Sequence, residues 1–182
     1  MRPLPALALL AQLPLWAATA TSAQTRHDSA APIDFGADHI ELQDKANRAV
    51  LSGSVAVKQA EMTLNAQRMT VNYTGQVIGG NPQVSRLDAA GGVTVKRPDQ
   101  TARSQYAVYD LNRRVITMVG GVQLNQGGNT VSGGRLTINL DSGRAVIDGS
   151  GVAGGGASVP GTTSSAPSGR VTGTFSVPKR DQ

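Results

Sequence analysis

Cysteine is absent from the 182 residues, and only two histidines occur, which leaves few groups for chemistry. Without cysteine there is no disulfide bond, no thiol nucleophile and no sulfur-ligated metal. His27 and His39 lack a second ligand at the spacing of a metal site, so we expect no metal. There is no G-x-S-x-G elbow or P-loop, and Asp34, Asp38 and Glu41 lie along one expected strand, where carboxylates usually only solvate a surface. We therefore predict no catalytic residue, no cofactor and no enzymatic activity.

Aromatic residues are also scarce, at 3% of the chain, whereas glycine occurs 22 times. Such a composition provides few large side chains to fill a thick core, and alternating Val, Leu and Ile favour thin β-structure instead. The formal net charge is only +5, and the basic residues are scattered without interleaved aromatic side chains. This pattern argues against nucleic acid as a partner and leaves an anionic partner open.

The first 23 residues have the pattern of an export signal. Arg2 precedes an apolar stretch from Leu4 to Ala18, and small residues lead up to Ala23. Prolines interrupt this stretch, and it is short of the roughly 20 apolar residues that a membrane span needs. An uncleaved anchor is the alternative. We predict cleavage after Ala23, export to the periplasm and a flexible lead-in over residues 24–32.

The rest of the chain is organised by a repeat, which two sets of small residues mark. The first set is Ala37, Ala66, Ser104 and Gly133, and the second is Gly53, Gly91, Gly120 and Gly149. Successive members of each set are 29 or 38 positions apart. A single insertion of nine residues within the segment 76–84 explains every longer step, and we expect this segment to form a loop at the rim of the fold.

Each repeat contains two runs of about ten residues in which apolar and polar residues alternate. In the first copy the runs are Ile33–Leu42 and Ala49–Val57, joined by a polar turn. A period of two places the apolar side chains on one face of each strand. The predicted lining of that face is Phe35, Ile40, Leu42, Leu51, Val55, Val57, Leu64, Met69, Val71, Val93, Val95, Tyr109, Ile116, Met118, Val122, Leu124, Val131, Leu136, Ile138 and Ile147.

The small residues fall in the middle of these runs, where glycine often marks a bend or bulge. Short Asp-, Asn-, Gly- and Pro-containing turns join neighbouring strands antiparallel. Stacked bends would crease the sheet, so we predict an all-β fold over residues 33–150. It is an antiparallel meander of bent strands folded into a β-taco, or β-jellyroll, with an apolar interior. A flat sheet packed on another body and a parallel β-solenoid are the structural alternatives.

The last part of the chain, residues 151–182, is rich in Gly, Ser and Pro and cannot bury enough apolar surface to fold alone. We expect a disordered tail. Within it Val171–Val177 has strand character and is the stretch that can pair with a sheet edge.

A creased sheet with two open ends leaves unpaired backbone groups on its first and last strands. Such edges permit strand addition, and head-to-tail addition between copies gives a filament. An apolar interior can hold acyl chains without specific hydrogen bonds, at a gain of roughly 0.8 kcal/mol for each CH₂ that leaves water.

The repeat resembles the OstA-like family of lipopolysaccharide-transport proteins. The resemblance rests on the order and spacing of ADHIEL (Ala37–Leu42), AVLSGSVAV (Ala49–Val57), MTLNAQRM (Met62–Met69), SQYAVYD (Ser104–Asp110) and GGRLTINL (Gly133–Leu140). It implies a non-catalytic periplasmic bridge that binds lipopolysaccharide through lipid A. It also implies an LptC-like inner-membrane partner, an LptD-like outer-membrane partner and head-to-tail self-association.

Two other functions fit the same residues less completely. The chain could be an assembly module of the cell envelope without a lipid ligand, whose apolar rows are only a core. A carbohydrate-active β-solenoid enzyme would need acids clustered on one exposed strip, and the sequence contains no such cluster.

Overall fold

The computed structural model describes residues 27–75, 80–149 and 171–174. The expected signal peptide, part of the 76–84 loop and most of the expected tail lie outside these residues. Within the described part, no helix is long and apolar enough to cross a membrane.

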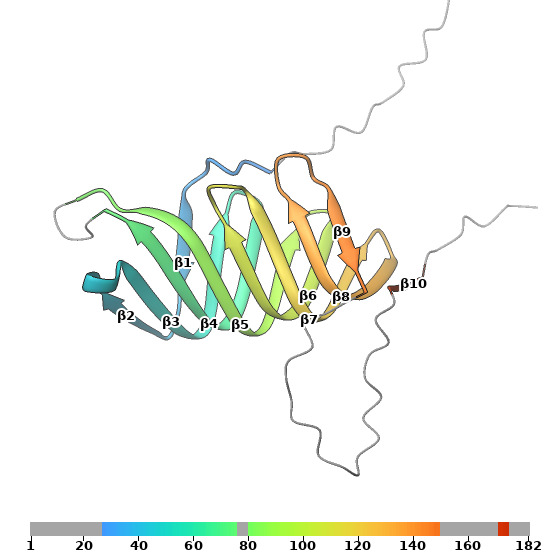
Figure 1. Ribbon diagram of the computed structural model, residues 1–182, viewed down its shortest axis with the longest axis horizontal. Coiled ribbons are helices and arrows are strands. Elements are labelled where there is room, and N and C mark those ends of the chain that lie inside the picture. The colour runs from blue at the N-terminus through green and yellow to red at the C-terminus, as the bar shows by residue number, and fades with distance from the viewer. Residues whose placement is uncertain (1–26, 76–79, 150–170, 175–182) are drawn as a thin grey trace, which may run out of the picture.

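The described chain forms one antiparallel sheet of ten strands, which Figure 1 shows folded along its length. The strands follow one another in the order β1-β3-β4-β5-β6-β7-β8-β10, with β2 also paired to β3 and β9 also paired to β8. The elements are β1 (Ile33–Gly36), β2 (His39–Gln43), the 3-10 helix η1 (Asp44–Ala46), β3 (Arg48–Gln59), β4 (Met62–Thr74), β5 (Gln83–Arg97), β6 (Gln100–Asp110), β7 (Val115–Gln126), β8 (Asn129–Asn139), β9 (Ala145–Asp148) and β10 (Thr172–Thr174). The predicted meander is confirmed, and the antiparallel pairing excludes a parallel solenoid.

A crease crosses the sheet at one level, because each long strand pair loses register there. The shifts lie between Ser52 and Val55, Asn65 and Arg68, Ala90 and Val93, Arg103 and Tyr106, and Val119 and Val122. Each of these shifts contains one of the small residues that mark the repeat. The predicted bends are therefore confirmed along β3 to β8. Gly149 is an exception, because it follows β9 and does not lie inside a strand.

The crease divides the sheet into two leaves that pack face to face. The first leaf consists of residues 39–43, 48–52, 68–72, 86–90, 106–110, 115–119, 135–139 and 145–148. The second leaf consists of residues 33–36, 55–59, 62–66, 93–97, 100–104, 122–126, 129–133 and 172–174. The hydrophobic core lies between the leaves, so the sheet covers itself and needs no second body.

Two boundaries differ from the sequence-based expectation. The lead-in was expected to be flexible over 24–32, but residues 27–32 are held against the sheet. The Gln59 amide nitrogen donates to the backbone carbonyls of Ser29 and Ala31, at 3.0 and 3.1 Å. The tail was expected to be disordered over 151–182 apart from Val171–Val177, which could pair with a sheet edge, and Thr172–Thr174 of this stretch do pair with β8. The strap residues gain order from a side chain of the sheet and β10 gains it from the β8 backbone, and composition reports neither contact.

Candidate functional site

The inner face of the creased sheet is a continuous apolar surface between the two leaves, here called the trough. Fifteen of the predicted lining residues are buried there: Leu51, Val55, Val57, Leu64, Met69, Val71, Val93, Val95, Tyr109, Ile116, Met118, Val122, Leu124, Leu136 and Ile138. Two more, Val131 and Ile147, are half-buried near the C-terminal end of the sheet. The period-two alternation thus placed these side chains on the inner face correctly. Their contact with a lipid remains a prediction.

The middle of the trough is closely packed. Leu51, Met69 and Ile116 have exposed fractions of 0%. The leaves therefore touch each other along this part of the trough. A guest can occupy it only if the leaves move apart, whether the guest enters from the side or from an end.

Sequence reasoning missed four large side chains of the interior. Met62, Tyr73, Leu87 and Leu140 are buried in the same core. The signal for Leu87 was present, because it lies two positions before Ala89 on the same face and pairs with Tyr109. The other three lie at strand ends, where the alternation runs into turns and its phase is harder to follow.

The N-terminal end of the trough is open. Phe35, Ile40 and Leu42 are 48%, 43% and 57% exposed, although their strand partners are the buried Val57, Leu51 and Ala49. Register therefore points these three side chains toward the inner face. They remain exposed because β1 and β2 are edge strands, and no further strand within the described chain lies beyond them.

The C-terminal end of the trough opens into a cavity of about 740 Å³. Its apolar wall is formed by Leu124, Val131, Leu140, Ile147 and Val171, from both leaves. Polar residues also line it, among them the charged Arg97 and Asp99. The trough thus has an apolar opening at each end, with a charged border at the C-terminal one.

Opposite the crease, the free rims of the two leaves face each other along a seam. Residues 27–32, here called the strap, run along this seam and can be followed as the blue segment before β1 in Figure 1. The Tyr109 hydroxyl of the first leaf donates a hydrogen bond to Gln59 Oε1 of the second leaf at 2.7 Å. Because Gln59 also binds the strap, one buried amide ties both leaves and the strap together.

Burial raises the pKa of Tyr109 to about 12, although the hydrogen bond to Gln59 acts in the opposite direction. The phenol is therefore neutral at physiological pH and acts as a hydrogen-bond donor. A buried, uncharged donor in a rim position suits a structural tie between the leaves and does not suit proton transfer near neutral pH.

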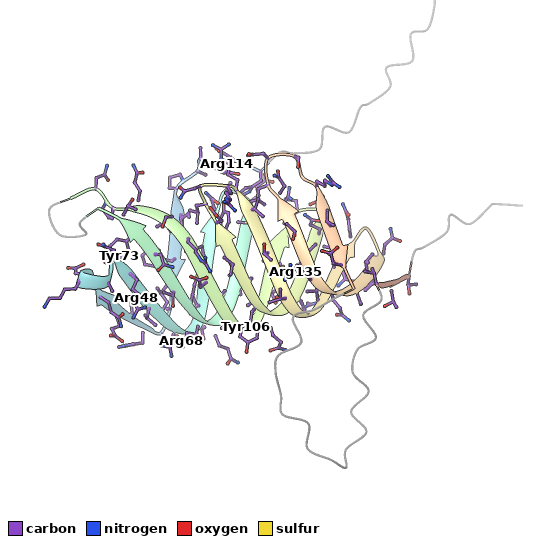
Figure 2. The ribbon with its side chains drawn as sticks, in the orientation of Figure 1. Arg48, Arg68, Tyr73, Tyr106, Arg114 and Arg135 are labelled. Carbon is purple, nitrogen blue, oxygen red and sulfur yellow. The ribbon has the colours of Figure 1, made fainter. Side chains whose placement is uncertain are left out.

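Arginine borders the seam as well. Arg114 lines a cavity of about 570 Å³ under the strap, together with Ile33, Val84 and Leu111. Its guanidinium lies 3.2 Å from an oxygen of Asp141, and both side chains are about half exposed. Figure 2 shows Arg114 at the rim, with Arg68 and Tyr106 on the opposite side along the crease. An anionic group that reached the seam would therefore meet a cation beside apolar side chains. Within the described chain, no three His, Asp or Glu side chains form a group that could hold a metal.

A sheet creased onto itself, apolar inside and open at both ends, defines the class of β-taco or β-jellyroll proteins. Comparison with known proteins gives the family. A family model described as LptA/(LptD N-terminal domain) LPS transport protein matches residues 35–144, and the chain belongs to this family. The expected membership of a lipopolysaccharide-transport family is therefore confirmed.

Two individual proteins are similar to the chain. A protein of Rhizobium meliloti (strain 1021), described as uncharacterized, is 31% identical over 121 residues, which cover 64% of this chain and 65% of that protein. The chain thus matches just under two thirds of this relative's length. The crystal structure of LptH from Pseudomonas aeruginosa is described as the LptA homologous periplasmic component of the lipopolysaccharide transport device. It aligns with a TM-score of 0.65 at 20% identity, over 83% of this chain and 99% of LptH.

Proposed function

We propose that this chain is a periplasmic, non-catalytic bridge that carries lipopolysaccharide from the inner to the outer membrane. The observation that carries the proposal is the continuous apolar inner face with an apolar opening at each end. The family of the chain and its resemblance in fold to a periplasmic transport component support the same reading.

The acyl chains of lipid A would lie between the leaves, where Val, Leu, Ile and Met side chains offer no polar partner. Each CH₂ that leaves water gains about 0.8 kcal/mol, so several chains together can offset the separation of two packed leaves. A row of similar apolar side chains offers many sites of nearly equal free energy. Such a surface favours passage along the trough over tight retention at one point.

The phosphates of lipid A would remain in water at the seam. Arg114 lines the cavity under the strap, and Arg97 lines a cavity beside the strap residues His27 and Asp28. A guanidinium can bind a phosphate through two parallel hydrogen bonds. The strap lies along the same seam, so lipid that enters from the side would displace it. Lipid that enters from an end can leave it in place.

The two edges of the sheet would provide the contacts with partners. β1 and β2 form one edge, and β9 and β10, which both pair with β8, form the other. Strand addition at these edges would link copies head to tail and join the ends of the row to an LptC-like inner-membrane protein and an LptD-like outer-membrane protein. A trough continued across each junction would let the acyl chains pass without meeting water.

Site-specific photo-crosslinking in cells tests the lipid ligand. A photoreactive residue is placed at Val71 or Val131 on the inner face, with Thr70 and Ser132 as matched outward neighbours on the same strands. We expect crosslinks to lipopolysaccharide from the two inner positions and none from the outer ones. Equal crosslinking from both faces would refute an acyl-chain site inside the trough.

One observation favours a second candidate, an envelope assembly module without a lipid ligand. The middle of the trough is fully packed, as a simple core would be. This candidate predicts that purified chain carries no co-extracted lipid by mass spectrometry and that labelled lipopolysaccharide does not bind, while copies still associate.

A further inference from the structure

The C-terminal edge of the sheet is built from two separate pieces of chain. On the first leaf, β9 pairs with β8 from Ala145 opposite Ile138 to Asp148 opposite Arg135. On the second leaf, β10 pairs with β8 from Thr172 opposite Ser132 to Thr174 opposite Thr130. Both pieces run antiparallel to β8 and lie on the same side of it, so they form one interrupted terminal strand. The interruption falls at the crease.

The N-terminal edge has the same construction. β2 pairs with β3 on the first leaf, and β1 pairs with β3 on the second leaf. The break, at residues 37 and 38, again lies at the crease. Since β1 and β2 share the single partner β3, their outer edges lie in one layer of the sheet.

β1 and β2 end the sheet at the same strand position on both leaves. They can both pair with another copy only if the edge of that copy also ends at one strand position on both leaves. Without β10, the C-terminal edge would consist of β9 on the first leaf and of β8 on the second. Neighbouring strands are about 4.8 Å apart, so such an edge would carry a step of that size at the crease. β1 and β2 could then not both pair with it.

The inner face supports the same role for β10. Gly173 lies opposite Val131, which faces inward, so Val171, two positions earlier, falls on the inner face as well. Val171 lines the terminal cavity together with Ile147 of the other leaf. The tail thus extends the apolar lining into the last layer on the second leaf, as β9 does on the first.

We propose that β10 completes the docking edge for a second copy of this chain. In this arrangement β9 receives β2 of the next copy and β10 receives its β1. The exposed Phe35, Ile40 and Leu42 then continue the apolar lining across the junction. The inference rests on the head-to-tail association proposed above and adds that the C-terminal tail is part of the contact.

Sedimentation velocity over a range of concentrations tests this role. The parent is the chain without its expected signal peptide, residues 24–182, here called the exported chain. It is compared with Gly173→Pro, in which a ring replaces a backbone N–H in β10, and with a chain that ends at residue 170. We expect both variants to associate at least about tenfold more weakly, which corresponds to about 1.4 kcal/mol, because one leaf of the junction loses its partner strand. Unchanged circular dichroism and retained lipid crosslinking from Val71 establish that the variants are folded.

A disulfide tether distinguishes a docking strand from a removable cap. The chain has no native cysteine, so Ser132→Cys with Thr172→Cys, a register pair, can be oxidised to hold β10 on β8. We expect oxidation to preserve or strengthen association. Loss of association on oxidation, or tighter association of the chain that ends at residue 170, would mean that β10 blocks the edge, and would overturn the proposal.

The outcomes also separate this inference from the proposed bridging function. If Gly173→Pro and the shortened chain associate as well as the exported chain does, β10 has no part in docking, but the bridge stands. If the exported chain does not associate at any concentration, head-to-tail assembly and the role of β10 both fail. The lipid crosslinks from the inner face then decide separately whether the chain binds lipopolysaccharide.

Discussion

Gly120 offers the most direct test of how the crease forms. Its φ is +86°, a left-handed conformation that costs an L-residue roughly 1–2 kcal/mol. A Cβ at this position would also lie 3.0 Å from Cβ of Gln105 on the neighbouring strand. We therefore expect Gly120→Ala to suffer from two separate effects, one in the backbone and one in the packing across strands.

Gly121, the next residue, isolates the backbone effect. Gly121 is also left-handed, with φ of +63°, but a Cβ there would have no other atom within 4 Å. Alanine reduces the entropy of the unfolded chain, which offsets about 0.4–1 kcal/mol of the cost at either position. The free energy of unfolding should then fall by about 0.5–1 kcal/mol for Gly121→Ala. We expect about 1.5–2.5 kcal/mol for Gly120→Ala, because overpacking adds about 1 kcal/mol or more.

Urea unfolding followed by circular dichroism gives these free energies, and thermal unfolding gives a second estimate. For an ordered domain of this size, 1 kcal/mol corresponds to a change in Tm of roughly 3–5 °C. Gly120→Ala should therefore melt several degrees below Gly121→Ala. Gly120→Val should lose more than either, because a β-branched residue fits positive φ least well.

Two results would refute the reasoning. If both alanine variants keep the parent stability, the backbone at the crease is not left-handed. If the two lose the same amount, the contact with Gln105 has no energetic weight. A double-mutant cycle of Gly120→Ala with Gln105→Gly measures that contact directly, and we expect a coupling of about 0.5–1.5 kcal/mol.

Three further predictions follow from other parts of the fold. Because burial raises the pKa of Tyr109 to about 12 from the ordinary tyrosine value of 10.0, stability is fully present below pH 10 and falls as the pH rises toward 12. Tyr109→Phe should lack this part of the alkaline loss in urea titrations at increasing pH, and at pH 7 it should cost about 0.5–1.5 kcal/mol for the hydrogen bond to Gln59. Met118→Ala, at a fully buried position, should cost about 2–5 kcal/mol in the same assay, and a loss below 1 kcal/mol would mean that the leaves collapse into the space. Phe35→Asp, at the exposed N-terminal end, should leave Tm within about 2 °C but weaken self-association in sedimentation experiments, and unchanged association would exclude this edge from the junction.

The alternation of apolar residues was sufficient to predict the strands and the side chains that line the trough. It was sufficient because a strand has only two faces, and an error of one position would have placed charged side chains such as Arg68 and Arg103 in the core. The recurrence of Gly53, Gly91 and Gly120 at one level likewise predicted the crease, since few other residues adopt the required backbone conformation. These features are local and repeat along the chain, so the sequence alone determines them.

Other features depend on partners that are distant in the sequence. The polar residue Gln59 would be expected on the surface, yet it is buried because Tyr109, from 50 positions later, and the strap surround it. The order of Thr172–Thr174 depends on the outer edge of β8, a strand that is distant in the sequence. Composition reports the average tendency of a segment to fold alone. The strap and Thr172–Thr174 are instead ordered by contacts with the rest of the sheet. The sequence showed that Val171–Val177 can pair with a sheet edge, but only the tertiary structure decided which edge it joins and how the seam is tied.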